Sequence, residues 1–257
     1  MHRPSTPDSS RDMLAPVLRD VRAVVFDTDG VITDSAKVHA AAWKAAFDGF
    51  LRAHPPEDSD RRRPFDEQDD YLRHVDGKSR LDGAEAFLTA RGIEASAKTV
   101  RAVAADKERL FTERLREHGV EAFPGTVRLV KALRAAGVPR AAASASRHAG
   151  ELLSRAEVLD LFDALVDGDE AARLGLAGKP APDLFLEAVR RLGAPADRAA
   201  VVEDALAGVE AGRRGGFALV VGVDRAAGAD TRARLLRHGA DIVVHDLGEL
   251  CAGGAPW

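Results

Sequence analysis

The chain has 257 residues, of which 46% are hydrophobic, so it is long enough to bury one large core or two unequal ones. Its 37 basic and 41 acidic residues leave a net charge of -4, which excludes the global basic field of a nucleic-acid binder. Cys251 is the only cysteine of the sequence, which excludes an internal disulfide and a cysteine-ligated metal site. A reducing cytoplasm is therefore the expected location.

The first 19 residues are polar and contain three prolines, without the apolar segment of a signal peptide. We expect residues 1–19 to form a flexible N-terminal tail. Further along the chain, no stretch approaches the roughly 20 apolar residues that a membrane-spanning helix requires. The sequence therefore predicts a protein that has no membrane partner.

The first predicted strand ends in an acidic motif. Residues 21–26 are short and apolar, as in a buried parallel strand, and Asp27, Asp29 and Asp34 follow around Gly30. Because side chains alternate along an extended backbone, Asp27 and Asp29 are expected to point the same way. Two carboxylates at such a short distance repel each other unless a cation or a proton offsets their charge. The motif therefore indicates a functional site.

The next region is predicted to be an all-helical insert. Helical patterns occupy residues 36–51, 84–91 and 98–118. The segment 52–64 contains three prolines among charged residues, which is typical of a solvated loop. Because no convincing strand occurs between Asp34 and Gly119, residues 35–119 are expected to form a helical domain of their own.

From Phe123 onward, short apolar runs alternate with helical patterns. The expected strands are residues 21–26, a short run ending before Ser144, and residues 164–166, 200–202, 219–223 and 242–244. The expected helices are residues 126–136, 149–158, 183–192, 205–213 and 230–238. This alternation implies a parallel sheet that helices cover on both faces. The predicted fold class is α/β, with residues 20–34 and 120–257 forming the core domain.

Polar side chains follow four of these strands, at the sheet edge where ligands bind in open parallel sheets. They are Asp27 with Asp29, Ser144 with Ser146, Asp167 with Asp169, and Glu203 with Asp204, and the loop at 178–183 adds Lys179. Such a set suits a phosphoryl group on Mg²⁺, because that ion prefers carboxylate and carbonyl oxygens. One acid could attack phosphorus and another could move a proton, while Lys179 and the Ser144 hydroxyl hold the phosphoryl oxygens.

Several of these residues also have structural explanations when each is taken alone. Ser144 is able to cap a helix. His39 and Trp43 lie four residues apart on one helix, so a packing pair fits their spacing as well as a contact with substrate does. Arg80 is also able to form a salt bridge within the helical insert.

Four short motifs, DTDG, SAS, KPAPD and ED, occur in this order between residues 21 and 244, and together they resemble the haloacid dehalogenase superfamily. The stretches DGVITDSAKVHAAAWK, DGKSR, SASR and KPAPDLFLEA are most similar to its β-phosphoglucomutase-like subfamily. The resemblance implies a Rossmann-like core with an α-helical cap inserted after the first motif.

The resemblance also implies a monomeric enzyme that acts on a small-molecule sugar phosphate. The implied reaction interconverts β-D-glucose 1-phosphate and glucose 6-phosphate through a phosphoaspartate and β-glucose 1,6-bisphosphate. A Mg²⁺-dependent sugar-phosphate phosphatase is one alternative. An inactive module that only binds sugar phosphate is another.

The residues that match the motifs receive implied roles. Asp27 would be the nucleophile, and Asp29 would be the general acid and base. The transferring phosphoryl group would be bound by Ser144, Ala145 and Lys179, and Mg²⁺ by Asp27, Asp29 through its main chain, Glu203 and Asp204. The sugar phosphate would be contacted by His39, Trp43, Gly77, Arg80, Lys107, Ser146 and Arg147. The chain departs from the family pattern at Arg147 and His148, where Lys and Asn are usual, and these changes bear on substrate choice.

Overall fold

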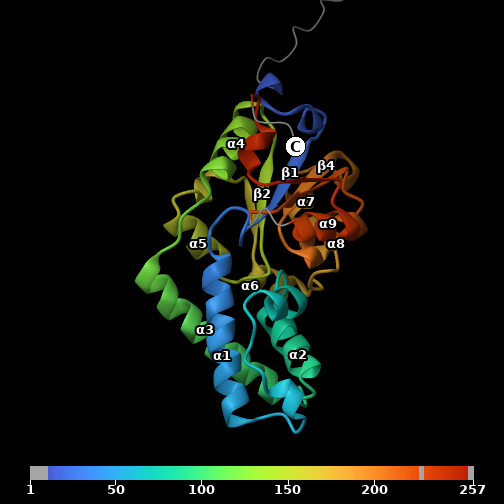
Figure 1. Ribbon diagram of the computed structural model, residues 1–257. Helices are drawn as coiled ribbons and strands as arrows, with labels where there is room; N and C mark the ends of the chain where they lie inside the picture. The colour runs from blue at the N-terminus through green and yellow to red at the C-terminus, as the bar shows by residue number, and fades with distance from the viewer. Residues whose placement is uncertain (1–10, 226–228, 254–257) are drawn as a thin grey trace, which may run out of the picture.

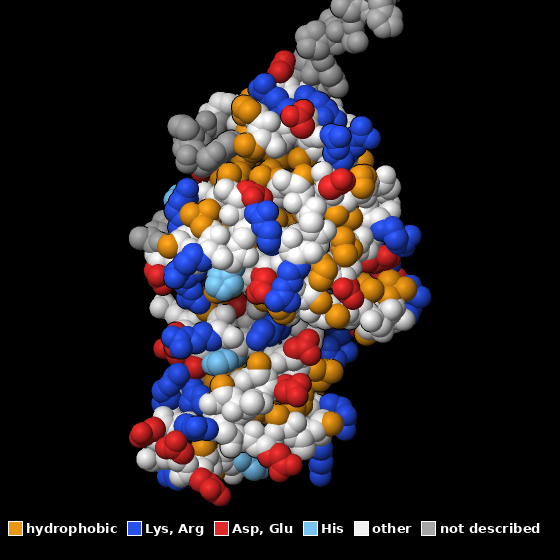
Figure 2. All heavy atoms as spheres, turned by 90° about the vertical axis from the view of Figure 1, so that its right-hand side faces the viewer, with side chains coloured by type: hydrophobic (Ala, Val, Ile, Leu, Met, Phe, Trp, Pro, Cys, Tyr) orange, Lys and Arg blue, Asp and Glu red, His pale blue; other side chains and the backbone are white. Residues whose placement is uncertain are grey.

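The computed structural model describes residues 11–225 and 229–253, as an α/β unit with a helical unit at one end of it (Figure 1). Figure 2 shows one face of the molecule, on which Lys and Arg side chains are interspersed with Asp and Glu. In the described ranges, no helix combines the length and the apolar character that crossing a membrane would require.

A six-stranded parallel sheet with the order β3-β2-β1-β4-β5-β6 forms the centre of the α/β unit. Its strands are β1 (Ala23–Asp27), β2 (Arg140–Ala143), β3 (Ala164–Val166), β4 (Ala199–Glu203), β5 (Leu219–Val223) and β6 (Ile242–Val244). The two strands that carry Asp27 and Glu203 as their last residues, β1 and β4, are direct neighbours. The predicted α/β fold with a parallel sheet is confirmed.

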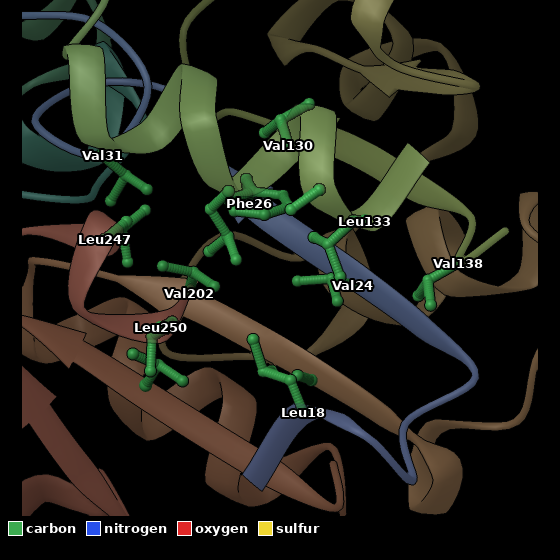
Figure 3. Packing of buried hydrophobic residues seen from close by; sticks show 14 of the residues in the cluster. Leu18, Val24, Phe26, Val31, Val130, Leu133, Val138, Val202, Leu247 and Leu250 are labelled. Carbon is green, nitrogen blue, oxygen red and sulfur yellow. The ribbon is translucent and has the colours of Figure 1, made fainter. Parts of the chain in front are cut away.

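Helices cover both faces of this sheet, as the predicted alternation requires. The helices α4 (Pro124–Ala135) and α5 (Ala149–Arg155) lie on one side, and α7 (Asp183–Arg191), α8 (Leu206–Arg214) and α9 (Ala229–His238) lie on the other (Figure 1). Val24 and Phe26 of β1 pack with Leu133 of α4 in one apolar cluster (Figure 3). Val25 points the opposite way and packs with Phe185 of α7 in a second cluster. The central strand is therefore buried on both faces.

The N-terminal segment differs from the expected tail. Leu14 and Leu18 are 0% and 1% exposed, and they pack in the same cluster as Leu247 and Leu250 near the C-terminus. The prediction of a flexible tail is therefore wrong for residues 11–19, while residues 1–10 lie outside the described residues. Leu14 and Leu18 lie in the short run MLAPVL, which Pro16 interrupts, so they carry no periodic signal, and their burial depends on packing against distant parts of the chain.

The helical unit between residues 36 and 118, here called the cap, has an apolar core of its own. It contains α1 (Ala36–Ala53), α2 (Arg80–Ala90) and α3 (Ala97–His118), and it lies beyond the carboxyl edge of the sheet (Figure 1). Phe47, Phe65 and Phe87 pack at its centre, with the rings of Phe47 and Phe87 4.0 Å apart. A separate aromatic core gives the cap a rigid interior that does not depend on the sheet.

The proline-containing loop of the cap is held at its end by an ion-pair network. Arg91 at the end of α2 is buried and donates to the Arg61 and Arg63 carbonyls and to the Asp70 carboxylate. Arg63 adds two hydrogen bonds of 2.8 Å to the same carboxylate. Most side chains of the loop are exposed, so it is solvated on the outside and anchored through its backbone.

Besides several 3-10 turns, one short α-helix and one π-helical turn were not predicted from the sequence patterns. The helix α6 (Gly168–Leu174) follows β3, and its N-cap is Asp167, whose carboxylate accepts from the Asp169 and Glu170 amides. Asp167 was expected beside the site, but it caps a helix instead. A π-helical turn covers Tyr71–Val75 just before α2. Both elements are short, and each has too few turns to display a periodic apolar face.

Candidate active site

A buried lysine bridges two carboxylates at the carboxyl ends of β1 and β4. The Lys179 Nζ lies 2.5 Å from Asp27 Oδ1 and 2.5 Å from Glu203 Oε1. All three residues are buried, and Glu203 also accepts a hydrogen bond of 2.6 Å from the Ala205 amide. The two carboxylates hold the pKa of Lys179 above its usual value against the effect of burial. The lysine is therefore a permanent cation beside Asp27.

Asp204 extends this cluster to a set that fits a divalent cation. Among the described residues, Asp27, Glu203 and Asp204 each offer a carboxylate oxygen, and these oxygens lie within 4.8 Å of one another. Burial and the neighbouring acids raise the pKa of Asp27 and of Asp204 well above their usual range. A hard divalent cation would offset this crowding of negative charge, so the donor set fits such an ion.

The turn after β1 brings Asp29 and Asp204 to the same place. Gly30 has a φ of +81°, and a Cβ at this position would lie 1.9 Å from Asp204 Oδ2. The Gly30 amide donates to the Thr33 carbonyl, which closes the turn. Glycine is therefore required both by the backbone conformation and by the close approach of the carboxylate.

Asp29 lies at the meeting point of the core and the cap. Its Oδ1 accepts from the Ser35 hydroxyl at 2.5 Å and lies 3.2 Å from His39 Nε2 of α1, and its Oδ2 accepts from the Ser144 hydroxyl at 3.3 Å. Burial tends to raise the pKa of Asp29, but His39, Ser35 and the Lys107 charge hold it below its usual range. Asp29 is therefore an ionised carboxylate in this arrangement.

The Ser144 hydroxyl takes part in this polar network and does not cap a helix. It also accepts a hydrogen bond of 3.0 Å from the Ser146 amide. The N-cap of α5 is His148. The capping alternative for Ser144 is therefore wrong.

Lys107 of α3 reaches the site from the cap. Its Nζ lies 2.8 Å from His39 Nδ1, and it lies 4.6 Å from the Phe111 ring centroid and 5.5 Å from that of Trp43. Burial lowers the pKa of Lys107 to about 8, although Asp29 opposes this effect. Burial and the Lys107 charge together lower the pKa of His39. Lys107, His39 and Asp29 thus form a chain of polar groups from the cap to the core.

His39 and Trp43 each stack on a different aromatic ring of the cap. The His39 ring stacks on Phe111 at 4.1 Å, and the Trp43 ring stacks on Phe47 at 4.8 Å. Arg80 is half-buried and makes no ion pair with any residue of the described ranges, so the alternative of a cap salt bridge is wrong. Gly77 approaches the core closely, because a Cβ there would lie 2.9 Å from the Ala205 Cβ.

One cavity of about 60 Å³ joins nearly all the predicted site residues. Its lining includes Asp27, Asp29, His39, Trp43, Gly77, Arg80, Lys107, Ser144, Ala145, Ser146, Arg147, Lys179 and Asp204. Glu203 is the remaining predicted residue, and it contacts the site through Lys179. Single molecules of drug size occupy cavities of roughly 300–1,000 Å³, so the cap lies closed on the core.

Sequence reasoning missed several residues that line the same cavity, among them the polar residues Tyr71, Asp76 and Glu108. Burial and the Glu203 charge raise the pKa of Asp76 to about 7, which places a further acid from the cap against the acidic cluster. Asp76 directly precedes Gly77 in the DGKSR stretch, so that motif could have indicated it. Tyr71 and Glu108 carry no comparable signal, because they lie in helical turns without a distinctive neighbour.

The fold and the site define a class of α/β enzymes with an acidic site under an inserted helical cap. The family profile of the haloacid dehalogenase-like hydrolases matches residues 21–216, and the chain belongs to this family. It is 42% identical over 258 aligned positions to a β-phosphoglucomutase of Mycobacterium bovis, with 97% of this chain and 98% of that protein covered.

Two further similarities agree with this placement. The chain is 34% identical to a β-phosphoglucomutase of Bacillus subtilis, with 90% of this chain and 92% of that protein covered. The fold resembles the crystal structure of a β-phosphoglucomutase from Clostridium difficile, with a TM-score of 0.69 and 23% identity. That comparison covers 90% of this chain and 93% of the other, and it concerns the fold alone.

Proposed function

We propose that this protein is a β-phosphoglucomutase, which interconverts β-D-glucose 1-phosphate and glucose 6-phosphate through β-glucose 1,6-bisphosphate. The observation that carries the proposal is the 42% identity over 97% of the chain to a β-phosphoglucomutase. The geometry at Asp27 supports phosphoryl transfer, which mutases and phosphatases share. The full-length similarity includes the cap, where the two activities differ.

Asp27 acts in the proposal as the nucleophile that becomes a phosphoaspartate. Its carboxylate attacks phosphorus, and the bond between phosphorus and the departing sugar oxygen breaks. Lys179, 2.5 Å from Asp27 Oδ1, offsets the negative charge that would otherwise repel the phosphoryl group. The Ser144 hydroxyl and the backbone amide of Ala145 hold phosphoryl oxygens at the end of β2.

Mg²⁺ is the proposed cofactor, held by Asp27, Glu203, Asp204 and the main chain of Asp29. When bound, it supplies positive charge that keeps the Asp27 carboxylate ionised and offsets the charge of the phosphoryl group. The raised pKa of Asp27 and Asp204, caused by burial and by their acidic neighbours, supports this assignment.

Asp29 carries the proton in both directions. As the sugar hydroxyl attacks the phosphoaspartate, its proton passes to Asp29 and the bond from phosphorus to the Asp27 oxygen breaks. His39 and Ser35 hold the pKa of Asp29 below its usual range against the effect of burial, so its carboxylate carries no proton beforehand and can take this one. The protonated Asp29 then returns the proton when the reaction runs in reverse.

The cap supplies the contacts to the sugar phosphate. A mutase needs a second phosphate-binding site, here called the distal phosphate grip, because the bisphosphate must bind with one phosphoryl group at Asp27 and the other at a distance from it. Arg80, Ser146 and Arg147 line the same cavity and form this grip. Since the closed cavity holds only about 60 Å³, the cap moves away from the core to admit substrate.

A coupled assay tests the proposal directly. The purified chain is mixed with Mg²⁺, β-D-glucose 1-phosphate and a trace of the 1,6-bisphosphate, and the formation of glucose 6-phosphate is followed. We expect isomerisation without release of inorganic phosphate. Release of inorganic phosphate without isomerisation would instead identify a sugar-phosphate phosphatase.

A further inference from the structure

A charged link joins the cap to the core beside the site. Glu108 of α3 accepts from Arg147 Nε at 2.8 Å, from Arg147 Nη2 at 2.5 Å and from His148 Nε2 at 2.6 Å. All three hydrogen bonds reach the same oxygen, Glu108 Oε1. Arg147 and His148 belong to the core loop that follows Ser144, so this carboxylate crosses the junction between the two units.

The donors around Glu108 resemble those of an anion-binding site. An Arg fork and an imidazole are the groups that proteins use to bind phosphate oxygens. Side-chain exposure is 16% for Glu108 and 17% for His148 but 37% for Arg147, so the link is screened from water at the imidazole and open to it at the guanidinium. Hydrogen bonds from His148 and Arg147 lower the pKa of Glu108 to about 2 against the effect of burial, and Glu108 in turn raises the pKa of His148. The contact is therefore a carboxylate held by a guanidinium and by an imidazole whose protonated form it favours.

This link occupies the region where the proposed function places a second phosphoryl group. Glu108 and Arg147 line the same cavity as Asp27, together with Arg80 and Ser146. We propose that the Glu108 carboxylate is an internal anion that takes the place of this second phosphoryl group in the closed, substrate-free molecule. The inference rests on the proposed function, because it is the mutase that needs a distal phosphate grip.

Two consequences follow from an internal anion at this position. Without substrate, Glu108 satisfies Arg147 and His148 and holds the cap against the core. When a sugar phosphate binds, its distal phosphoryl group displaces the carboxylate from Arg147. Glu108 therefore competes with substrate and favours release of product, at the expense of affinity.

The first test uses the ligand-free protein and does not depend on any sugar phosphate. Glu108→Gln keeps the shape of the side chain and removes its charge, and Glu113→Gln is the matched control on the same helix. Glu113 is half exposed and pairs with Arg109 one turn away on α3, so its substitution leaves the contacts of Glu108 with Arg147 and His148 intact.

Amide hydrogen exchange reports the opening of the cap. We expect protection at residues 144–148 to fall about tenfold in Glu108→Gln and to stay at the wild-type level in Glu113→Gln. Unchanged protection in Glu108→Gln would overturn the role of Glu108 in holding the cap closed.

The second test measures binding by calorimetry in an Asp27→Asn background, which blocks phosphoryl transfer. Glucose 1,6-bisphosphate should bind about tenfold more tightly when Glu108→Gln is added, because the competing charge is gone, and Glu113→Gln should have no effect. Weaker binding in Glu108→Gln would mean that Glu108 positions Arg147 for the phosphate, and this would overturn the proposal.

A titration with sulfate separates this inference from the proposed function. If no variant binds the bisphosphate, the proposed function fails. Tighter sulfate binding by Glu108→Gln than by Glu113→Gln would still support the inference that Glu108 acts as an internal anion at Arg147 and His148. Equal sulfate binding by the two variants would overturn it.

Discussion

The cavity is lined on one side by residues of the α/β core, here called the core wall, and on the other by residues of the cap, here called the cap wall. The two walls are held in place in different ways. On the core wall, Asp27 and Glu203 end neighbouring strands, and Lys179 joins them with a side chain that is 1% exposed. On the cap wall, Lys107 and Glu108 project from a helix that belongs to the other unit. Glu108 meets the core through its side chain, and Lys107 is linked to the core through His39, which contacts Asp29. The hydrogen-bonded sheet fixes the first set, whereas the second set is in place only while the cap is closed.

This difference indicates a division of work between the two walls. Groups that form and break bonds to phosphorus gain from a rigid position, because catalysis depends on preorganised charge. Groups that recognise the sugar phosphate must separate to let it in and out. Substitutions on the core wall should therefore affect turnover and stability strongly, and substitutions on the cap wall should act mainly through closure and affinity.

The largest effect is expected for Asp27→Asn. An amide cannot attack phosphorus, so turnover should fall by about 10³-fold or more. The free energy of unfolding should stay within about 1 kcal/mol of wild type, because burial already raises the pKa of Asp27 and favours a neutral group there. Steady-state assay and urea unfolding check the two parts.

Asp34→Asn is the control for Asp27→Asn, since Asp34 lies on the same loop and its ion pair is with the exposed Lys37. It should retain turnover. Retained turnover in Asp27→Asn would instead remove the phosphoaspartate from the mechanism.

The next effect in size is expected for Lys179→Met. Removing the cation leaves Asp27 and Glu203 buried without a counter-charge, and the loss of one partner from a buried ion pair costs about 3–5 kcal/mol. Burial already raises the pKa of Asp27 and Lys179 opposes this, so in the variant Asp27 binds a proton more readily when folded than when unfolded, and the stability should fall as pH rises. Urea unfolding at pH 5 and pH 7 measures this trend.

Lys37→Met provides the comparison, because the Lys37 side chain is 86% exposed and its pair with Asp34 is on the surface. Its stability should lie within about 0.5 kcal/mol of wild type at both pH values. A loss in Lys179→Met as small as this would mean that the core wall does not depend on its buried cation.

The smallest effect concerns the pH dependence of the cap wall. Glu108 raises the pKa of His148 in the folded protein, so their contact contributes fully below the unfolded His pKa of about 6.5 and is lost as pH rises through the higher folded value. The exposed side of the link limits this contribution to about 1 kcal/mol. Melting temperatures of wild type and His148→Asn between pH 5.5 and 8.5 should converge at high pH.

The quantity to compare is the difference in melting temperature between wild type and His148→Asn at each pH. The pKa of Asp76, raised to about 7 chiefly by burial, makes stability fall over the same pH range in both proteins. A constant gap between wild type and His148→Asn would show that the charge on His148 does not support closure.

The core wall was predictable because its acids and Ser144 stand next to recognisable strands, while Lys179, which lies in the loop 178–183, was marked by the KPAPD motif. Asp27, Ser144 and Glu203 lie at or just after apolar runs, and parallel strands bring their carboxyl ends to one edge. The alternation of helix and strand likewise predicted the sheet. By contrast, Leu14 and Leu18 could not be placed, since their burial depends on a segment more than 200 residues away.

The cap wall was predictable only where a motif marked it. Gly77, Arg80 and Lys107 were placed through the family resemblance and line the cavity as expected. Asp76 and Glu108 also line it, but helical periodicity identifies an apolar face and is silent about which charged residue of a helix will meet another unit.

By itself, then, the sequence determined the class of fold, the acids at the ends of the strands and the existence of a helical insert. These depend on local pattern, and the geometry of a parallel sheet converts local pattern into position. Only the tertiary structure decided that the Lys179 cation bridges Asp27 and Glu203 and that Glu108 binds Arg147 and His148. Such contacts depend on how separate units pack together, and the free energy of that packing is not encoded in any one stretch of chain.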